Sequence, residues 1–192
     1  MNKITISIFV AFLMVFAIGN LDAGPTSYGI KIQESGSFIS TGAGFDTNGD
    51  GRMADLILTN GKGNNVLGQT NTTSVIDWPT VFGLTTCNGL PGYGAVLGAN
   101  AGSFIIRTSN GDLLYGIFDS GGTNCIQLTI SPPFIGNIYI NLEGSFTGGT
   151  GKFKGASGDI TLEATAYPVL VVNFDVKYGA VETNVTGVIN LP

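Results

Sequence analysis

The feature that most constrains this fold is a two-residue alternation of apolar and polar side chains through the C-terminal half of the chain. In residues 137–143, the apolar side chains are Ile138, Ile140 and Leu142, and the positions between them are mostly polar. The same period recurs in residues 160–167, 172–178 and 181–191. Successive residues of a strand point to opposite faces of a sheet, so the pattern predicts strands with two different faces.

Short turn signals separate the predicted strands. Asn110-Gly111 lies between two β-rich runs in residues 104–118, which predicts a hairpin. Clusters of Gly, Asn, Ser and Pro predict further turns at 59–63, 120–124 and 131–133. About eight or nine strands joined by short connections indicate an antiparallel barrel or sandwich, because an open sheet leaves edges that pair with other chains. We expect an all-β fold, a single antiparallel barrel of about eight strands.

The longest irregular region is predicted between about residues 79 and 101. It contains Cys87, one of two cysteines in the chain, the other being Cys125. In an oxidising compartment the two are expected to form one disulfide. Closing a loop of about 39 residues stabilises the fold by roughly 4 kcal/mol in the chain-entropy model. The alternative is a redox-active thiol pair, which has no CxxC spacing to support it.

The N-terminus has the features of a secretory signal. Lys3 precedes an apolar run from Ile4 to Ile18, followed by small residues that suit cleavage after Gly19 or Ala23. The alternative is a permanent membrane anchor, but a run of about 15 residues is shorter than the roughly 20 that span a bilayer. We therefore predict a signal peptide at residues 1–23, a barrel domain at residues 24–192, and a secreted or periplasmic protein with no stable membrane span after cleavage.

Composition excludes several function classes. The chain has no histidine, which removes Ser-His-Asp and Cys-His mechanisms and His-ligated zinc or haem. Its net charge is −5 and it has no basic run, which argues against a nucleic-acid partner. Any proton transfer would fall to carboxylates, Tyr, Lys or bound water. The oligomeric state is left open by the sequence.

The segment FDTNGDGRMADL, residues 45–56, predicts a calcium site. Asp46, Asn48 and Asp50 stand at positions 1, 3 and 5 of a calcium-type loop, and the carbonyl of Arg52 is at position 7. Asp55 completes the candidate ligand set, although it stands one residue later than in propeller-type calcium loops. Position 12, where a helix-flanked calcium hand has Glu, is Ile57. We predict a structural calcium ion; the alternative is a polar turn without metal.

A second motif, GGTGKF at residues 148–153, is followed by a turn of small residues. It resembles the GGTGxFxxAxG signature of dirigent proteins, shared more loosely by allene oxide cyclases and by bacterial secreted proteins with an allene-oxide-cyclase-like barrel. The resemblance covers about residues 113–189. It implies a calycin-like, eight-stranded antiparallel barrel with an apolar lumen, which in plant members holds a hydrophobic reactive substrate without an organic cofactor. The motif's own glycines suit a tight turn at the barrel rim.

Five carboxylates in or near predicted strands are candidates for a lumenal general acid or steering charge, namely Asp112, Asp119, Glu143, Glu163 and Asp175. Small residues such as Gly116, Ala164, Ala166 and Gly187 predict a lumen that is only partly filled. The first function we expect is a barrel that binds an apolar small molecule in its lumen. Two alternatives remain: a cofactor-free isomerase, cyclase or coupling-guide enzyme, and a structural or surface-interaction protein with a filled barrel.

Overall fold

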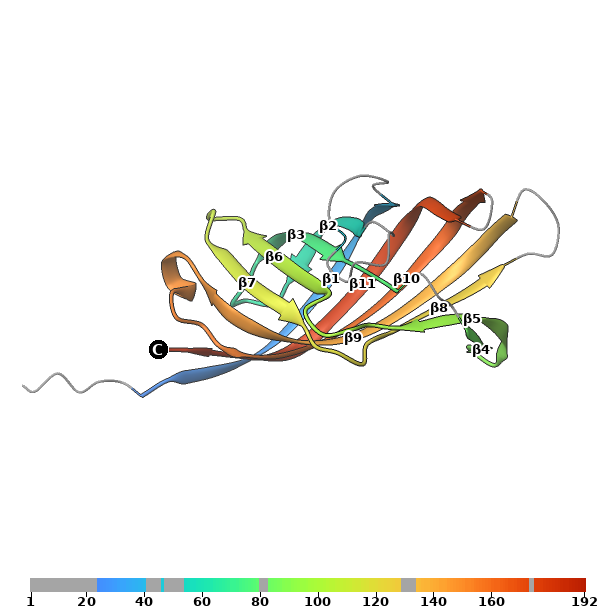
Figure 1. Ribbon diagram of the computed structural model, residues 1–192. Coiled ribbons are helices and arrows are strands. Elements are labelled where there is room, and N and C mark those ends of the chain that lie inside the picture. The colour runs from blue at the N-terminus through green and yellow to red at the C-terminus, as the bar shows by residue number, and fades with distance from the viewer. Residues whose placement is uncertain (1–23, 41–45, 47–53, 80–82, 129–133, 173–174) are drawn as a thin grey trace, which may run out of the picture.

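The computed structural model describes residues 24–40, 46, 54–79, 83–128, 134–172 and 175–192. In these ranges the chain forms strands and one short 3-10 helix (Figure 1). The predicted signal peptide and most of the predicted calcium loop lie outside the described residues. Within the described ranges, no helix has the length and apolar character needed to cross a bilayer.

Eight antiparallel strands form a closed barrel. In spatial order they are β1 (Thr26–Ser40), β2 (Asp55–Gly63), β3 (Gln69–Ile76), β6 (Gly102–Thr108), β7 (Leu113–Phe118), β9 (Phe134–Gly149), β10 (Gly158–Val172) and β11 (Asp175–Leu191). The pairing of β11 with β1 and of β9 with β10 closes the circle. The expectation of an all-β, eight-stranded antiparallel barrel is confirmed.

Three further strands extend the sheet beyond the barrel. The first half of β9 pairs with β8 (Thr123–Leu128), whereas its second half pairs with β7 on the same edge. Strand β5 (Leu90–Val96) pairs with β8, and β4 (Gly83–Cys87) pairs with β5. The prediction of an irregular loop over residues 79–101 was therefore wrong in its centre. Asn88 (φ 50°) and Gly89 (φ 84°) form a two-residue turn between β4 and β5, the turn that Asn-Gly favours in hairpins.

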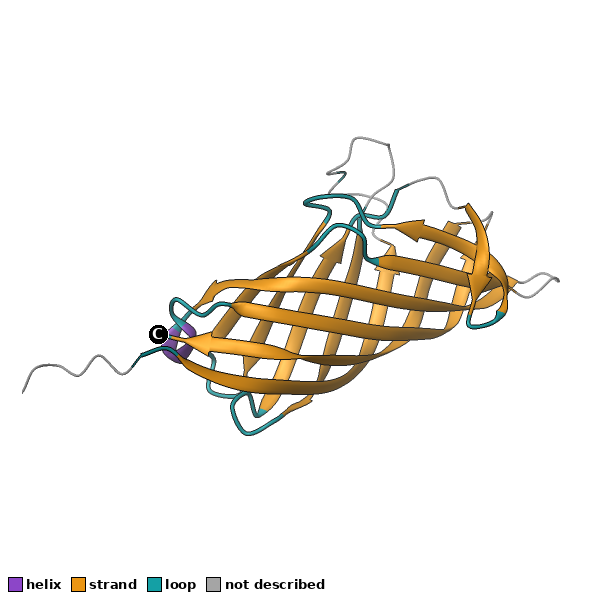
Figure 2. Ribbon diagram, turned by 90° about the horizontal axis from the view of Figure 1, so that it is seen from below, coloured by secondary structure: helices purple, strands orange, loops and turns teal. Residues whose placement is uncertain are grey.

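The two ends of the barrel differ. Hairpin turns at 64–68 and 109–112, the 3-10 helix η1 (Gly151–Phe153) and the C-terminus lie at one end, which we call the turn end (Figure 2). At the other, which we call the loop end, β1 terminates, β2 begins and residues 77–79 leave β3. The hairpin predicted at Asn110-Gly111 is confirmed, with Gly111 at φ 88°.

The turn predicted at 59–63 was wrong, because these residues are the end of β2. A Cβ at Gly61 would lie 2.0 Å from the carbonyl oxygen of Gln33 on β1. Glycine is needed here because the two strands approach each other closely. The chain turns in the segment directly after β2, at Asn64–Gly68.

The alternation seen in the sequence sets which side chains fill the barrel. Ile138, Ile140 and Leu142 are buried, and Glu143 on the opposite face is exposed. The core is continuous across β1, β2, β3, β6, β7, β9, β10 and β11. At the turn end it is aromatic: the Phe104 ring lies 5.0 Å from that of Phe118 and 5.8 Å from that of Phe146, centroid to centroid.

Candidate functional site

The GGTGKF segment closes the turn end. Gly148 and Gly151 have positive φ, as do Gly155 and Gly158 further along, so the expected role of the motif's glycines in a rim turn is confirmed. This turn places Phe153 in the hydrophobic core, where its side chain is fully buried. Lys152 donates from Nζ to the Val66 carbonyl oxygen at 2.5 Å, which ties the turn to the neighbouring hairpin. The motif therefore builds a plug, and the turn end is filled.

The middle of the barrel holds a buried polar cluster. Glu34 on β1 is 5% exposed. Its carboxylate accepts one hydrogen bond from Thr59 Oγ1 at 2.6 Å and one from Thr72 Oγ1 at 2.8 Å. The two hydroxyls come from β2 and β3, so the cluster joins three consecutive strands of the barrel. A buried carboxylate needs such donors, because an unsatisfied charge inside a protein is costly.

A small cavity lies near the loop end. Its volume is about 10 Å³, which is about the space that one water molecule requires. The wall is mainly apolar and includes one indole, with two polar side chains; the residues are Phe38, Asp55, Ile57, Trp78, Asn124, Ile138, Ile140, Ala166 and Val181. They come from six strands of the sheet and from the segment that follows β3.

Asn124 on β8 is the unusual member of this wall. Its side chain is 3% exposed, and Oδ1 has no hydrogen-bond partner among the described residues. Asp55 at the start of β2 is 7% exposed and lines the same cavity. The cavity thus combines an apolar wall with an acceptor that the described protein atoms leave unused.

The carboxylates that the structure shows to be buried are not those that the sequence suggested for the lumen. Asp119, Glu143 and Glu163 are exposed on the outside, and Asp112 is half-buried in the β6–β7 turn. The Asp175 side chain lies outside the described part of the chain. Among the side chains that the structure describes, the buried acids are instead Glu34, Asp55 and Asp77. Glu34 lies an even number of positions from Ile30, Ile32 and Phe38 along the same strand, so its side chain points to the same face as theirs. The alternation rule applied to residues 30–38 could therefore have identified Glu34 as an inward-facing acid.

Of the predicted calcium ligands, the structure describes Asp46 and Asp55. Asp46 is half-buried. Asn48, Asp50 and Arg52 lie outside the described residues. The side chain of Asp55 faces the lumenal cavity, so its placement links the predicted loop to the wall of that cavity. Within the described ranges, no group of three or more Asp, Glu, Cys or His side chains is arranged to hold a metal ion.

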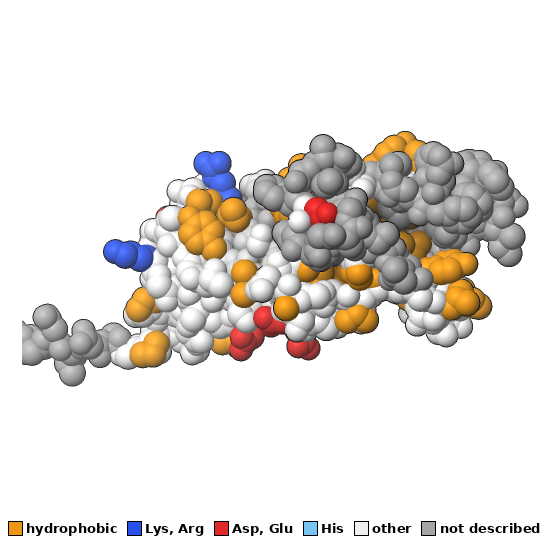
Figure 3. Space-filling view, viewed as in Figure 1, with side chains coloured by type: hydrophobic (Ala, Val, Ile, Leu, Met, Phe, Trp, Pro, Cys, Tyr) orange, Lys and Arg blue, Asp and Glu red, His pale blue; other side chains and the backbone are white. Residues whose placement is uncertain are grey.

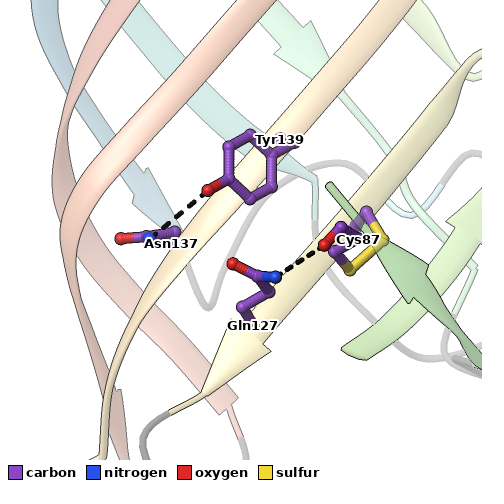
Figure 4. The surroundings of a disulfide bond; sticks show 5 residues. Cys87, Gln127, Asn137 and Tyr139 are labelled. Carbon is purple, nitrogen blue, oxygen red and sulfur yellow. Dashed lines mark hydrogen bonds between the residues drawn. A yellow bond between two sulfur atoms is a disulfide. The ribbon is translucent and has the colours of Figure 1, made fainter. Parts of the chain in front are cut away.

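The predicted disulfide between Cys87 and Cys125 is present, with the two Cα atoms 5.6 Å apart. It joins β4 to β8 across β5, and Gln127 Nε2 donates to the Cys87 carbonyl oxygen at 2.6 Å (Figure 4). A Cβ at Gly92 on β5 would lie 2.3 Å from Cys87 Sγ. Glycine at position 92 therefore leaves the space through which the disulfide crosses.

No family model and no curated protein sequence matches the chain. Among solved structures, it is similar to the one described as the structure of the pterocarpan synthase dirigent protein GePTS1. The identity is 15%, the match covers 86% of each chain, and the TM-score is 0.24. The fold assignment rests on the strand pairing itself.

Proposed function

We propose that this protein binds a small, mainly apolar molecule that carries a hydrogen-bond donor, and that it does so at the loop end of the barrel. The observation that carries the proposal is the Asn124 amide oxygen, buried on an apolar cavity wall without a partner among the described residues. A buried acceptor left unsatisfied costs about 1–3 kcal/mol. A ligand hydroxyl or amine that donates to Oδ1 recovers this cost, and the apolar wall favours the rest of the ligand.

The cavity as it stands accommodates one water molecule, so a larger ligand must displace wall side chains. Trp78 is the side chain best placed to report this, because it is the only tryptophan of the chain and is 1% exposed. Its fluorescence therefore gives a direct signal from the cavity wall.

The test is a titration followed by Trp78 fluorescence, using menthol and p-menthane. The two probes share a carbon skeleton and differ by one hydroxyl. We expect a saturable change with both and tighter binding of menthol. In Asn124→Leu, which replaces the amide by an apolar side chain of similar size, the preference for menthol should fall about fivefold, since a hydrogen bond contributes about 1 kcal/mol.

Asn60→Leu is the matched control, because Asn60 is exposed on the outer face of β2. It should keep the preference for menthol. Absence of any saturable fluorescence change with either probe, together with no co-purified small molecule in native mass spectrometry, would reject the proposal. Chemical turnover of a bound ligand, lost in Asp55→Asn, would instead favour the cofactor-free enzyme.

A second candidate is a filled barrel whose function lies on its outer surface. The aromatic packing at the turn end favours it, because Phe104, Phe118, Phe146 and Phe153 leave that half of the lumen occupied. In this case the cavity near Asn124 holds only water, and the exposed strands beyond the barrel carry the activity.

Export of the protein and calcium binding belong to the same proposal. Lys3, the apolar run after it and the disulfide support an oxidising compartment outside the cytoplasm. The spacing of Asp46, Asn48 and Asp50 supports a calcium ion that stabilises the loop end of the barrel.

A further inference from the structure

The last strand of the sheet, β4, has an open edge. Strand β4 pairs with β5 on one side, and none of the described strands pairs with it on the other. Natural sheets protect such edges with charged side chains, proline or bulges, because unpaired backbone groups act as a template for another strand. The sequence of β4, Gly-Leu-Thr-Thr-Cys, contains none of these devices.

The β4–β5 hairpin is held firmly in place. The Cys87–Cys125 disulfide bonds the hairpin to β8 next to the Asn88-Gly89 turn, and Gln127 donates to the Cys87 carbonyl oxygen. Strand β5 is also paired with β8 from Tyr93 to Val96. The open edge is therefore presented by a fixed element of the fold, so pairing with it costs little ordering entropy.

The hairpin geometry defines which backbone groups face outward. In a two-residue hairpin the residues that flank the turn, Cys87 and Leu90, form a hydrogen-bonded pair. Alternate residues of an antiparallel strand then direct their N–H and C=O groups to opposite edges. The backbone groups of Leu84 and Thr86 consequently face the open edge.

The surface around this edge is uncharged and partly apolar. Residues 83–96 contain no Asp, Glu, Lys or Arg. Leu84 is 83% exposed, and Leu90, Tyr93 and Val96 are also exposed. In the space-filling view, hydrophobic side chains lie at the end where Figure 1 places β4 and β5, and the visible Lys and Arg side chains lie at the other end (Figure 3).

We propose that β4 pairs with β4 of a second copy of this chain, antiparallel and across a two-fold axis. Two copies with a net charge of −5 each repel one another over most of their surface. The uncharged hairpin is a face on which they approach without a like-charge contact. With Thr85 on the axis, Leu84 lies opposite Thr86 of the second copy and Thr86 lies opposite its Leu84, which satisfies the outward-facing backbone groups of both strands.

The size of the contact determines its strength. A five-residue strand and a few exposed apolar side chains provide less area than the standard stable interface of about 1,600 Å². The dimer should therefore be weak and form with increasing concentration. It does not depend on the pocket near Asn124, which lies on the inner side of the sheet.

The test is sedimentation velocity of the purified, oxidised protein from about 10 μM to about 1 mM, a range that covers weak association. We expect wild-type protein to shift from monomer to dimer. Leu84→Lys adds two like charges on the same face of the shared sheet, diagonally across the axis, and Thr86→Pro removes an outward-facing N–H. Both variants should remain monomeric. Leu58→Lys is the control, because Leu58 is 42% exposed on β2, a strand that is paired on both edges, and it should dimerise like the wild type.

Hydrogen exchange provides a second readout at residue level. Exchange of the Leu84 and Thr86 amides should slow at least several-fold between the lowest and highest concentrations, whereas exchange of the exposed Asn88 turn should not change. A wild-type protein that is monomeric at the highest concentration would overturn the proposal. So would a dimer that persists in Leu84→Lys. If Thr86→Pro does not fold, Leu84→Lys and the exchange data decide the result.

Discussion

The ring of Phe104 occupies the space that a side chain at position 116 would need. The two residues are direct partners on β6 and β7, and a Cβ built on Gly116 would lie 2.0 Å from Phe104 Cζ. Glycine on one strand thus allows a phenylalanine on the next to lie across the lumen. The small residue at position 116, which the sequence suggested would leave the lumen partly empty, instead accommodates the aromatic core of the turn end.

Replacement of Gly116 by Ala should destabilise the protein by about 1–3 kcal/mol, because the added methyl group forces the Phe104 ring out of its packed position. Urea unfolding measures the change. Gly29→Ala is the control, since Gly29 is also a strand glycine but has no atom within 4 Å of the Cβ position. Equal effects of the two substitutions would mean that Phe104 adapts freely.

The polar cluster gives a second prediction. Thr72→Val removes the donor to Glu34 Oε1 and leaves a buried carboxylate oxygen with one partner fewer. We expect a loss of about 1.5–3 kcal/mol in the free energy of unfolding, the range for hydrogen bonds to charged groups. Thr73→Val on the same strand is exposed and should change stability by about 0.5 kcal/mol or less. In a Glu34→Gln background the cost of Thr72→Val should shrink, since no buried charge remains.

The sequence was sufficient for the local features of this fold. The two-residue period correctly identified the inward faces of β9 and β10, and Asn110-Gly111 correctly identified a hairpin. The same dipeptide forms the β4–β5 turn at Asn88-Gly89, but residues 79–101 were expected to be irregular, because the strands in this glycine-rich stretch are short and weakly patterned. Long-range features were harder to predict. Residues 59–63 contain the composition of a turn, yet the close approach of β1 to β2 is what requires glycine there.

The candidate site was less predictable for the same reason. Glu34 faces the lumen because of its position in the inward–outward alternation of β1. Its hydrogen-bond partners, Thr59 and Thr72, lie 25 and 38 residues away in sequence. Asn124 lines the cavity because β8 pairs with the first half of β9, on the same edge that pairs with β7 in its second half. Neither relationship has a local sequence signature. Barrel closure brings these side chains together, and closure is set by strand pairing far apart in the chain.

The disulfide should contribute strongly to stability. Replacing both Cys87 and Cys125 by Ser should lower the free energy of unfolding by up to about 4 kcal/mol, as expected for a loop of about 39 residues. Thermal unfolding with and without reductant provides the check. Reductant should lower the melting temperature of the wild type and leave that of the double variant unchanged. If the wild type melts at the same temperature in both conditions, the disulfide contributes only local order to the β4–β5 hairpin.

Calcium should raise the melting temperature of chelator-treated protein by several degrees. An ion that binds the folded loop and not the unfolded chain stabilises by about 2.7 kcal/mol at a hundredfold excess over its dissociation constant. Replacing Asp46 and Asp50 by Ala should abolish the response, because these residues supply carboxylate oxygens at loop positions 1 and 5. The double variant Asp119→Ala and Asp159→Ala removes the same charge from exposed positions elsewhere and should keep the response. Asp55→Asn should weaken the response of the melting temperature to calcium. The same substitution alters the wall of the cavity near Trp78, so the fluorescence of Trp78 should change together with the calcium response. If calcium and chelator leave the wild-type melting curve unchanged, residues 46–55 form a polar turn without metal.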